Sequence, residues 1–378
     1  NKKNINIGSA YGLDNMIMEK KKKKNVNISN TSGNINGGSY TVGIYSAGGT
    51  AVNNSNINLG NASVGMYMSG GTGTVDTTGR ITVGNGIRKT VSGSEVIESG
   101  VALYASNGAV ITNLSPNISV GSDSIIGYSK GAGSKIVNRG NLTLGTEAIG
   151  FYTSGGELEN HGTLSSGGDG VIYFYGKNGK ITNNGNINGS AYNYGVGIYG
   201  SNSEIINTKN IILGNTYYNP AKSDDPSDPS HRYAVGIYGD QSKIYNDGEI
   251  NVGQRGIGIY SYGQTGDLIN DTNGKIISSG DNAVGLLVEG SGSYNVINKG
   301  SILLSGKNSV GVSINRNTIL INNGLIQVSG ENSVGIMAEA SSKVINNSTI
   351  SALGTSTAGV VLRGGSVLEN NGTITGLV

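Results

Sequence analysis

The stretch NSVGVSINRNTILINNGLIQVSGENSVGIMAEASSKVINNSTI, residues 308–350, carries the pattern that decides the fold. Ser309-Val-Gly-Val returns as Ser333-Val-Gly-Ile, and Asn322-Asn returns as Asn346-Asn, each 24 residues later. A fixed short period with the same residue type at the same place indicates a solenoid, in which each repeat packs on the next one.

Outward from this stretch, an Asn that follows one or two apolar residues recurs through the chain, mostly at intervals of 22 to 25 residues. Its members are Asn30, Asn53, Asn113, Asn138, Asn160, Asn183, Asn207, Asn246, Asn270, Asn298, Asn322, Asn346 and Asn370, with Thr77 expected in the same place once. Parallel coils about 4.8 Å apart would stack these side chains so that amide donors and acceptors pair along a ladder. We therefore predict that this Asn column is structural.

Two apolar columns accompany the Asn column. Four to six residues after each Asn comes an aliphatic residue, namely Ile35, Ile57, Ile81, Ile118, Leu142, Leu164, Ile187, Ile211, Ile250, Ile276, Ile302, Ile326, Ile350 or Ile374. A third column follows, with Val42, Val64, Ile125, Ile149, Ile172, Val196, Ile257, Val284, Val310, Val334 and Ala358, and usually with Gly next. Because side chains two apart on a strand share a face, Val42 and Ile44 are expected to point into the interior together.

Three short strands per period, separated by Gly, Asn and Ser turns, favour an all-β fold, a right-handed parallel β-helix. About 14 coils of roughly 24 residues with an Asn ladder would form one continuous segment over residues 1–378. A β-sandwich is disfavoured, because its antiparallel hairpins would not place like residues over one another. The right-handed sense rests on analogy with known β-helices and on the usual hand of parallel crossovers.

The amino-acid composition and the net charge argue against several classes of function. The chain has 65 Gly, 2 Phe and no Trp, so its core must be thin and aliphatic. A net charge of +2 and the lack of a nucleic-acid-binding motif argue against a nucleic-acid partner. The absence of Cys excludes disulfides and Cys-ligated zinc, and it suits a chain exported across a membrane in unfolded form.

No catalytic, metal or cofactor site is expected. One of the two His residues, His161, occupies a variable turn position where other coils hold Arg139, Asn184 or Lys299, which indicates a solvated turn residue. No serine-nucleophile, zincin or P-loop motif is present. The run Gly167-Gly-Asp-Gly is similar to part of a calcium-binding nonapeptide, but it occurs once and such sites require repetition.

Two insertions break the period, at residues 84–99 and 215–232, and loops on a rigid scaffold are where binding residues usually lie. Tyr side chains next to charged groups suit a glycan or protein contact. The candidate ligand-binding residues are Tyr217, Tyr218, Asp224, Asp225, Asp228, His231, Arg232, Arg88 and Lys89. The alternatives are that both insertions are merely tolerated, or that the paired Asp224 and Asp225 bind calcium.

A Tyr column and a basic run are further candidates. Tyr follows the third column as Tyr45, Tyr67, Tyr104, Tyr128, Tyr152, Tyr175, Tyr199, Tyr238 and Tyr260, and the last coils carry Leu287, Ser313, Met337 and Val361 there. Cross-coil stacking of the rings is the first interpretation, and a carbohydrate-binding stripe is the second. The run Lys20–Lys24 is interpreted as a solvated loop, with attraction to anionic surfaces as the alternative.

The units Val-Gly-Ile-Tyr-Ser (42–46), Val-Gly-Ile-Tyr-Gly (196–200 and 235–239) and Ser-Val-Gly-Ile-Met (333–337), with Asn-Asn-Gly turns, resemble the passenger domains of large type V autotransporter adhesins of fusobacteria. The RadD/Fap2-like group is the most similar. The resemblance implies a cell-surface, secreted fibre that binds a glycan or protein receptor on host cells or other bacteria, with roles in coaggregation, biofilm and virulence. It also implies anchoring to the outer membrane through a C-terminal barrel that is not in this chain.

The function predicted from the sequence is therefore adhesion, without enzymatic activity. The alternative is a polysaccharide lyase or glycoside hydrolase of the pectinase-like β-helix type, which would need Asp, Arg and Lys gathered at one height of the helix. Self-association of the segment is a further possibility left open by the sequence.

Overall fold

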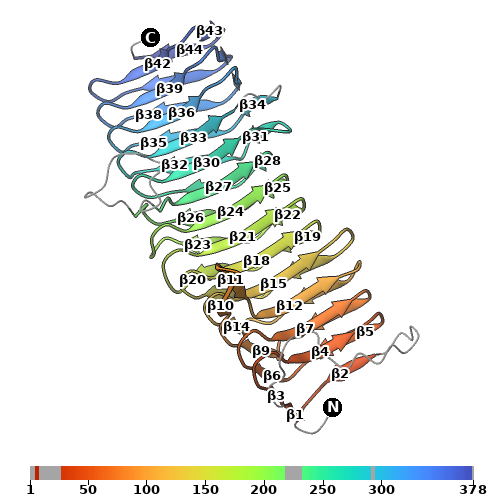
Figure 1. Ribbon diagram of the computed structural model, residues 1–378. Helices are drawn as coiled ribbons and strands as arrows, with labels where there is room; N and C mark the ends of the chain where they lie inside the picture. Colours follow the sequence, from red (N-terminus) through yellow and green to blue (C-terminus); the bar gives the residue numbers. More distant parts are fainter. Residues whose placement is uncertain (1–4, 8–26, 218–231, 291–293, 377–378) are drawn as a thin grey trace. The chain divides into compact units, whose positions relative to one another are not determined.

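The computed structural model describes residues 5–7, 27–217, 232–290 and 294–376. In these residues all regular structure is β (Figure 1). The chain divides into two compact units, residues 1–184 and 185–378. Each unit is a parallel β-solenoid whose coils contribute one strand to each of three sheets, which we call the tyrosine, asparagine and third sheets. Among the described residues, the asparagine sheet has seven strands in each unit, so the predicted parallel β-helix of about 14 coils is confirmed.

In the first unit the strands pair in parallel with those of the same sheet. The tyrosine sheet holds β4 (Val42–Ser46), β7 (Val64–Ser69), β12 (Val101–Ser106), β15 (Ile125–Lys130), β18 (Ile149–Ser154) and β21 (Ile172–Lys177). The asparagine sheet holds β2 (Ile28–Asn30), β5 (Thr50–Asn53), β8 (Thr72–Val75), β13 (Val110–Asn113), β16 (Lys135–Asn138), β19 (Glu157–Asn160) and β22 (Lys180–Asn183). The third sheet holds β1 (Ile5–Ile7), β3 (Ile35–Gly37), β6 (Asn56–Leu59), β9 (Arg80–Val83) and β14 (Ile118–Val120), and, after a break in strand pairing, β17 (Leu142–Leu144) and β20 (Leu164–Ser166). An antiparallel pair, β10 (Ile87–Val91) and β11 (Ser94–Glu98), stands apart.

The second unit repeats the same three-sheet plan. Its tyrosine sheet holds β24 (Val196–Ser201), β27 (Val235–Asp240), β30 (Ile257–Tyr262), β33 (Val284–Glu289), β36 (Val310–Ile314), β39 (Val334–Ala338) and β42 (Ala358–Leu362). Its asparagine sheet holds β25 (Glu204–Asn207), β28 (Lys243–Asn246), β31 (Leu268–Asn270), β34 (Asn295–Asn298), β37 (Ile319–Asn322), β40 (Lys343–Asn346) and β43 (Val367–Asn370). Its third sheet holds β23 (Ile187–Gly189), β26 (Ile211–Leu213), β29 (Glu249–Asn251), β32 (Lys275–Ser278), β35 (Ser301–Leu304), β38 (Leu325–Val328), β41 (Thr349–Ala352) and β44 (Thr373–Thr375).

The Asn side chains form the predicted ladder. In the second unit, Nδ2 of Asn270 donates to Oδ1 of Asn298, and Nδ2 of Asn298 donates to Oδ1 of Asn322, each at 2.8 Å. In the first unit, Asn138 donates to Asn160 at 2.8 Å, and its amide also donates to the turn carbonyl of Gly140 at 2.9 Å. Buried amides that would otherwise lack partners are thereby satisfied, which is the physical reason for the column.

The ladder has one interruption, and the prediction that Thr77 fills it was wrong. Val75 is the residue in register with Asn53 on one side and Asn113 on the other, and it is fully buried. Thr77 is an exposed residue of the following turn. The sequence prediction looked for a polar residue at this position, but in this coil an apolar residue replaces the Asn. Nδ2 of Asn53 donates instead to the carbonyl of Arg80 at 3.4 Å.

All three sheets contribute aliphatic side chains to the core: the aliphatic column of the third sheet, the second apolar residue of the tyrosine-sheet strands, and a column of the asparagine sheet that includes Ile111, Ile205 and Leu320. The expectation that Val42 and Ile44 share the interior was wrong in part, because Ile44 is buried and Val42 is half-buried. The Gly between such residues faces the core instead: a Cβ on Gly285 would lie 2.5 Å from the carbonyl oxygen of Gly311 and 2.6 Å from Cγ2 of Ile302. The Gly column therefore reflects close packing.

The first unit departs from this Gly column in several coils. Ala102, Ile126 and Tyr173 occupy the Gly position there, and all three are buried. Beside Ile126, Gly127 makes room for a ring, since a Cβ on it would lie 2.6 Å from Cδ1 of Phe151. Burial also raises the pKa of Tyr173 to about 12. Large and small residues therefore exchange places between neighbouring coils, which keeps the interior filled.

The turn that leads from the third sheet to the tyrosine sheet, which we call the corner, contains a residue in the left-handed conformation in most coils. These residues, with φ between 44° and 58°, are Tyr40, Ala62, Asp123 and Glu147 in the first unit and Tyr194, Arg255, Asn282, Asn308, Asn332 and Ser356 in the second. Asn tolerates this conformation, whereas a bulky residue with positive φ is an outlier. Tyr40 and Tyr194 are therefore unexpected at this position.

Candidate functional site

Both insertions interrupt the same corner of the repeat. The first lies between β9 and β12 in the first unit, and the second lies between β26 and β27 in the second unit. Each brings a cation over one of the two left-handed tyrosines: Nζ of Lys89 is 5.0 Å from the ring centre of Tyr40, and Cζ of Arg232 is 5.1 Å from that of Tyr194. Both insertions therefore contact the solenoid through a cation–π interaction with a tyrosine of the corner.

The first insertion folds as the β10–β11 hairpin, and its cations are paired within the protein. Arg88 makes a bidentate contact with Asp123 at 2.7 and 2.9 Å, and its Nη1 donates to Glu95 at 2.9 Å. Nζ of Lys89 lies 2.7 Å from Oε2 of Glu98. These partners hold the pKa values of Asp123 and Glu98 below their usual range. The candidate ligand-binding residues Arg88 and Lys89 thus attach the hairpin to the solenoid.

The tip and one edge of this hairpin are apolar and solvent-exposed. Val91 is 54% exposed, and Val96 and Ile97 are each 43% exposed. The ion pairs of Arg88 and Lys89 lie nearer the base of the hairpin. They hold β10 and β11 in place, while the apolar side chains remain exposed to solvent.

The base of the second insertion is closed by an antiparallel bridge between Tyr217 and Arg232. The amide of Tyr217 donates to the carbonyl of Arg232 at 2.9 Å, and the amide of Arg232 donates to the carbonyl of Tyr217 at 3.1 Å. The ring of Tyr217 meets that of Tyr194 edge to face, with 6.2 Å between ring centres. Tyr217 is 51% exposed, so an aromatic surface beside a guanidinium is open to solvent.

The neighbouring coil holds this base in position. Oγ1 of Thr216 donates to the carbonyl of Arg255 at 2.7 Å and accepts from the amide of Ala234 at 3.0 Å. The amide of Thr216 donates to the carbonyl of Gln254 at 3.0 Å. Of the predicted site residues in this insertion, Tyr218, Asp224, Asp225, Asp228 and His231 lie outside the described residues.

The sequence interpretation missed Tyr194, Tyr40 and Asp123. Tyr194 had a detectable signal, because the turn Ser190-Ala-Tyr-Asn-Tyr-Gly carries two aromatic residues where most sister coils carry none. Asp123 had no such signal, since an Asp in a turn is ordinary and its partner Arg88 lies 35 residues earlier.

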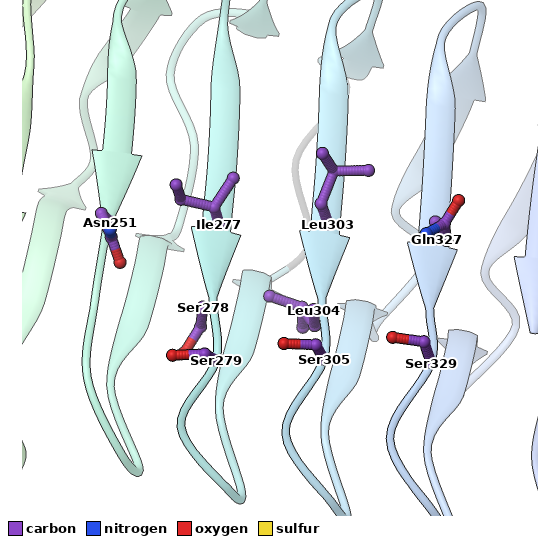
Figure 2. A pocket seen from close by; sticks show the side chains of 9 residues that line it. All are labelled: Asn251, Ile277, Ser278, Ser279, Leu303, Leu304, Ser305, Gln327 and Ser329. Carbon is purple, nitrogen blue, oxygen red and sulfur yellow. The ribbon is translucent and has the colours of Figure 1, made fainter. Parts of the chain in front are cut away.

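A shallow groove of about 250 Å³ runs along the outer side of the third sheet in the second unit, next to the corner (Figure 2). Its floor includes Ile277 and Leu303, which are half-buried and in register on β32 and β35. Amide side chains flank them, and a row of hydroxyls forms one edge; these residues are Asn251, Gln327, Ser279, Ser305 and Ser329. The lining side chains of this groove are uncharged.

The tyrosine column stacks from coil to coil. Ring centres are 4.6 Å apart for Tyr67 and Tyr104, 5.0 Å for Tyr104 and Tyr128, and 4.8 Å for Tyr199 and Tyr238. The rings are half-buried, and burial raises the pKa of Tyr104 to about 12. The stacking interpretation agrees with this geometry, while the carbohydrate-binding stripe stays a prediction.

Several ionisable side chains on the described surface form ion pairs between coils. His161 is exposed in a turn, as expected, and its Nε2 contacts Oε1 of Glu159, which also pairs with Lys135. Lys135 and His161 hold the pKa of Glu159 below its usual range. Within residues 5–7, 27–217, 232–290 and 294–376, no group of three His, Asp or Glu side chains is placed to hold a metal. The same residues include no helix long and apolar enough to cross a membrane.

Comparison with known proteins gives one match. Residues 263–351 match the family model of the BigA third pectate lyase-like domain. The matched range lies in the second unit and includes the groove strands β32, β35 and β38. No curated protein and no solved structure matches the chain. The match covers less than a third of the sequence, and it agrees with the β-helical fold of that part.

Proposed function

We propose that this chain is an adhesive segment of a bacterial surface protein of the fusobacterial type V autotransporter kind, displayed on the cell and anchored to the outer membrane. It attaches to a glycan or protein receptor on host cells or other bacteria, and so contributes to coaggregation, biofilm and virulence. The supporting observation is that both insertions interrupt the same corner of a repetitive scaffold, and each seats a cation on a left-handed tyrosine there. Binding residues are typically carried on loops held by a rigid scaffold.

The solenoid itself suits this role. Its interior amides pair with one another, and its strands pair with the next coil, so few backbone groups are left for recognition. The two insertions add side chains that the repeat lacks, and they do so at the same corner. The match to a pectate lyase-like domain of BigA fits a β-helical passenger-like protein, which supports display at the cell surface.

A cell-attachment assay tests the proposal. We expect the purified chain to bind intact cells, and we expect binding to fall at least tenfold when residues 218–231 are replaced by a short Gly/Ser loop or when residues 84–99 are removed. The matched control is Lys307→Gln with Glu331→Gln, which removes an exposed ion pair at another coil's corner. Undiminished attachment by both loop variants would contradict the proposal.

A second candidate function is that of a polysaccharide lyase or glycoside hydrolase, because the matched family is described as pectate lyase-like and most residues that line the groove lie in the matched range. Such an enzyme needs a carboxylate, Arg, Lys or His at the scissile bond. The groove instead presents Ser, Asn, Gln, Ile and Leu side chains. We therefore propose binding without catalysis. A loss of viscosity of polygalacturonate during incubation with the chain would favour the enzyme.

A further inference from the structure

We infer that the outer edge of β11 is a self-recognition site, to which β11 of a second copy of this chain adds in antiparallel orientation. The two hairpins then form one four-stranded sheet with a two-fold axis at Val96. Because the partner is a second copy of the chain, the inference goes beyond the receptor binding proposed above and does not depend on it.

The first step of the argument is that the β10–β11 hairpin has open edges. It is a two-stranded sheet that receives no further strand within the described residues, and residues 88–97 are all exposed to solvent. Strands inside the solenoid sheets, such as β12 and β35, pair with a neighbour on each side. A two-stranded hairpin alone is at best marginally stable in water, and an exposed apolar edge strand is a template for another chain. The hairpin can therefore accept a further strand.

The turn of the hairpin determines which backbone groups of β11 point outward. Ser92 and Gly93 form a two-residue turn with φ of 50° and 82°, as in a type I′ hairpin. Such a turn places a hydrogen-bonded pair of residues directly beside it, and hydrogen-bonded and non-hydrogen-bonded pairs then alternate along the strands. The amide and carbonyl of Glu95 and of Ile97 thus point away from β10. Among the described residues they have no backbone partner.

The charge pattern favours the edge of β11 over the edge of β10. In a symmetric antiparallel pair, the register that uses both outward residues of each strand places the two-fold axis at Val96 on β11 and at Lys89 on β10. On β10, Lys89 then faces its own copy, and like charges directly opposite each other are destabilising. On β11, Val96 faces Val96 and each Glu95 faces Ile97 of the second copy, so no two carboxylates are directly opposite.

This register also covers the apolar side chains of β11. Val96 and Ile97 are each 43% exposed, and they lie on opposite faces of the strand. The two Val96 side chains meet at the axis on one face, and the two Ile97 side chains are diagonal neighbours on the other. Because the strands run antiparallel, the two solenoids lie at opposite ends of the shared sheet, and only the small turn residues Ser92 and Gly93 of each copy approach the solenoid of the other.

The ion pairs of the hairpin prepare this edge for association. Arg88 contacts Asp123 at 2.7 and 2.9 Å and Glu95 at 2.9 Å, while Nζ of Lys89 lies 2.7 Å from Oε2 of Glu98. Both carboxylates of β11 are therefore compensated within their own copy, which limits their repulsion across the axis. Since the strand pair is already held in place, less conformational freedom is lost on association.

The contact is small, and this sets the kind of association to expect. Only the five residues Ser94–Glu98 of each copy meet, which is fewer than in a standard stable interface. The dimer is therefore weak and depends on protein concentration. A test must either capture the dimer covalently or follow its formation over a range of concentrations.

Cysteine cross-linking captures the dimer, because the chain has no Cys of its own. At the axis, the two Val96 residues form a non-hydrogen-bonded pair with Cα atoms about 4.5 Å apart, which a disulfide can span. The full chain with Val96→Cys should form disulfide-linked dimers in oxidised glutathione. The matched control is Val91→Cys, which is 54% exposed on the same face of the hairpin. We expect the control to cross-link at least about tenfold more slowly, because the dimer does not hold its thiols together.

Sedimentation velocity of the full chain follows the dimer without cross-linking. Val96→Lys places two ammonium groups at the axis and should weaken dimerisation at least about tenfold, whereas Val96→Thr keeps a β-branched side chain there and should retain the dimer. Ile97→Pro removes an outward N–H that the hairpin itself does not use, so it should also weaken the dimer. Amide exchange checks that β10 and β11 remain paired in each variant.

Three outcomes would overturn the inference. The first is equal cross-linking of Val96→Cys and Val91→Cys. The second is a dimer that persists in both Val96→Lys and Ile97→Pro while the hairpin stays folded. The third is a chain that forms no dimer at any concentration, yet loses attachment to cells through Val96→Lys, because the edge of β11 then serves a strand of the receptor and not a second copy.

Discussion

The asparagine ladder and the two insertions use polar side chains in opposite ways. In the ladder, each Asn pairs with the same residue type one coil further on, as Asn298 does with Asn322. In the insertions, each polar group pairs with a residue of another type, as Arg88 does with Asp123. The Asn hydrogen bonds recur in coil after coil and together stabilise the solenoid. The contacts of an insertion occur once and position the side chains of that insertion only. The difference teaches which changes should affect stability and which should affect recognition.

The largest expected effect is on the ladder. Asn298→Val leaves the Nδ2 of Asn270 without its amide acceptor and the Oδ1 of Asn322 without its amide donor, in a buried position. We expect the free energy of unfolding to fall by about 2–5 kcal/mol, since each orphaned buried group costs about 1–3 kcal/mol. Urea unfolding followed by circular dichroism measures this loss.

The converse variant sharpens the comparison. Val75→Asn places an amide between Asn53 and Asn113, where both neighbours can pair with it. We expect a change within about 1 kcal/mol of the parent, because the new amide is satisfied. A loss as large as that of Asn298→Val would show that the ladder is not the reason for the Asn column.

The next effect concerns the Gly column of the second unit. Gly285→Ala brings a Cβ within 2.5 Å of the carbonyl oxygen of Gly311 and 2.6 Å of Cγ2 of Ile302. We expect a loss of about 1–3 kcal/mol from overpacking. Gly145→Ala is the control, because a Cβ there meets nothing within 4 Å and the backbone φ is not in the left-handed region. Equal losses in the two variants would argue against a steric role of the column.

The smallest effect is a pH dependence confined to the first insertion. Because Arg88 and Lys89 lower the pKa values of Asp123 and Glu98, these pairs stabilise the hairpin above the unfolded pKa values of about 4. That contribution is lost as pH falls through the lower folded-state values. We expect amide-exchange protection of residues 87–98 to decrease below about pH 4 while protection of the ladder strands persists.

Arg88→Gln is the matched variant for this measurement. It should reduce protection of the hairpin at pH 7 and weaken its dependence on pH, because the bidentate contact with Asp123 is gone. Protection of the hairpin that is unchanged both by acid and by Arg88→Gln would mean that strand pairing alone holds β10 and β11 in place.

The sequence was sufficient for the fold wherever one residue type recurs at a fixed spacing. The Asn column and the aliphatic column of the third sheet were placed correctly, because stacked coils impose the same environment on the same position. It was insufficient where a coil departs from the repeat: Thr77 was chosen although Val75 fills the position, and Val42 was placed in the core although its neighbour Gly43 faces the core.

For the candidate site, the sequence located the insertions and two of the three residues that meet at the base of the second insertion, Tyr217 and Arg232. It did not identify Tyr194, whose importance depends on its left-handed backbone and on the ring contacts with those two residues. It also could not show that Arg88 and Lys89 have carboxylate partners, which come from the hairpin and from a later coil.

The sequence by itself determined the periodic part of this protein: three strands per coil, an amide ladder and a thin aliphatic core. The tertiary structure alone decided which cation meets which ring and which carboxylate at the corner. The physical reason is that a ladder is a contact between equivalent positions, so its partner can be read from the period. A contact at an insertion joins positions with no fixed spacing, and only the folded path of the chain brings them together.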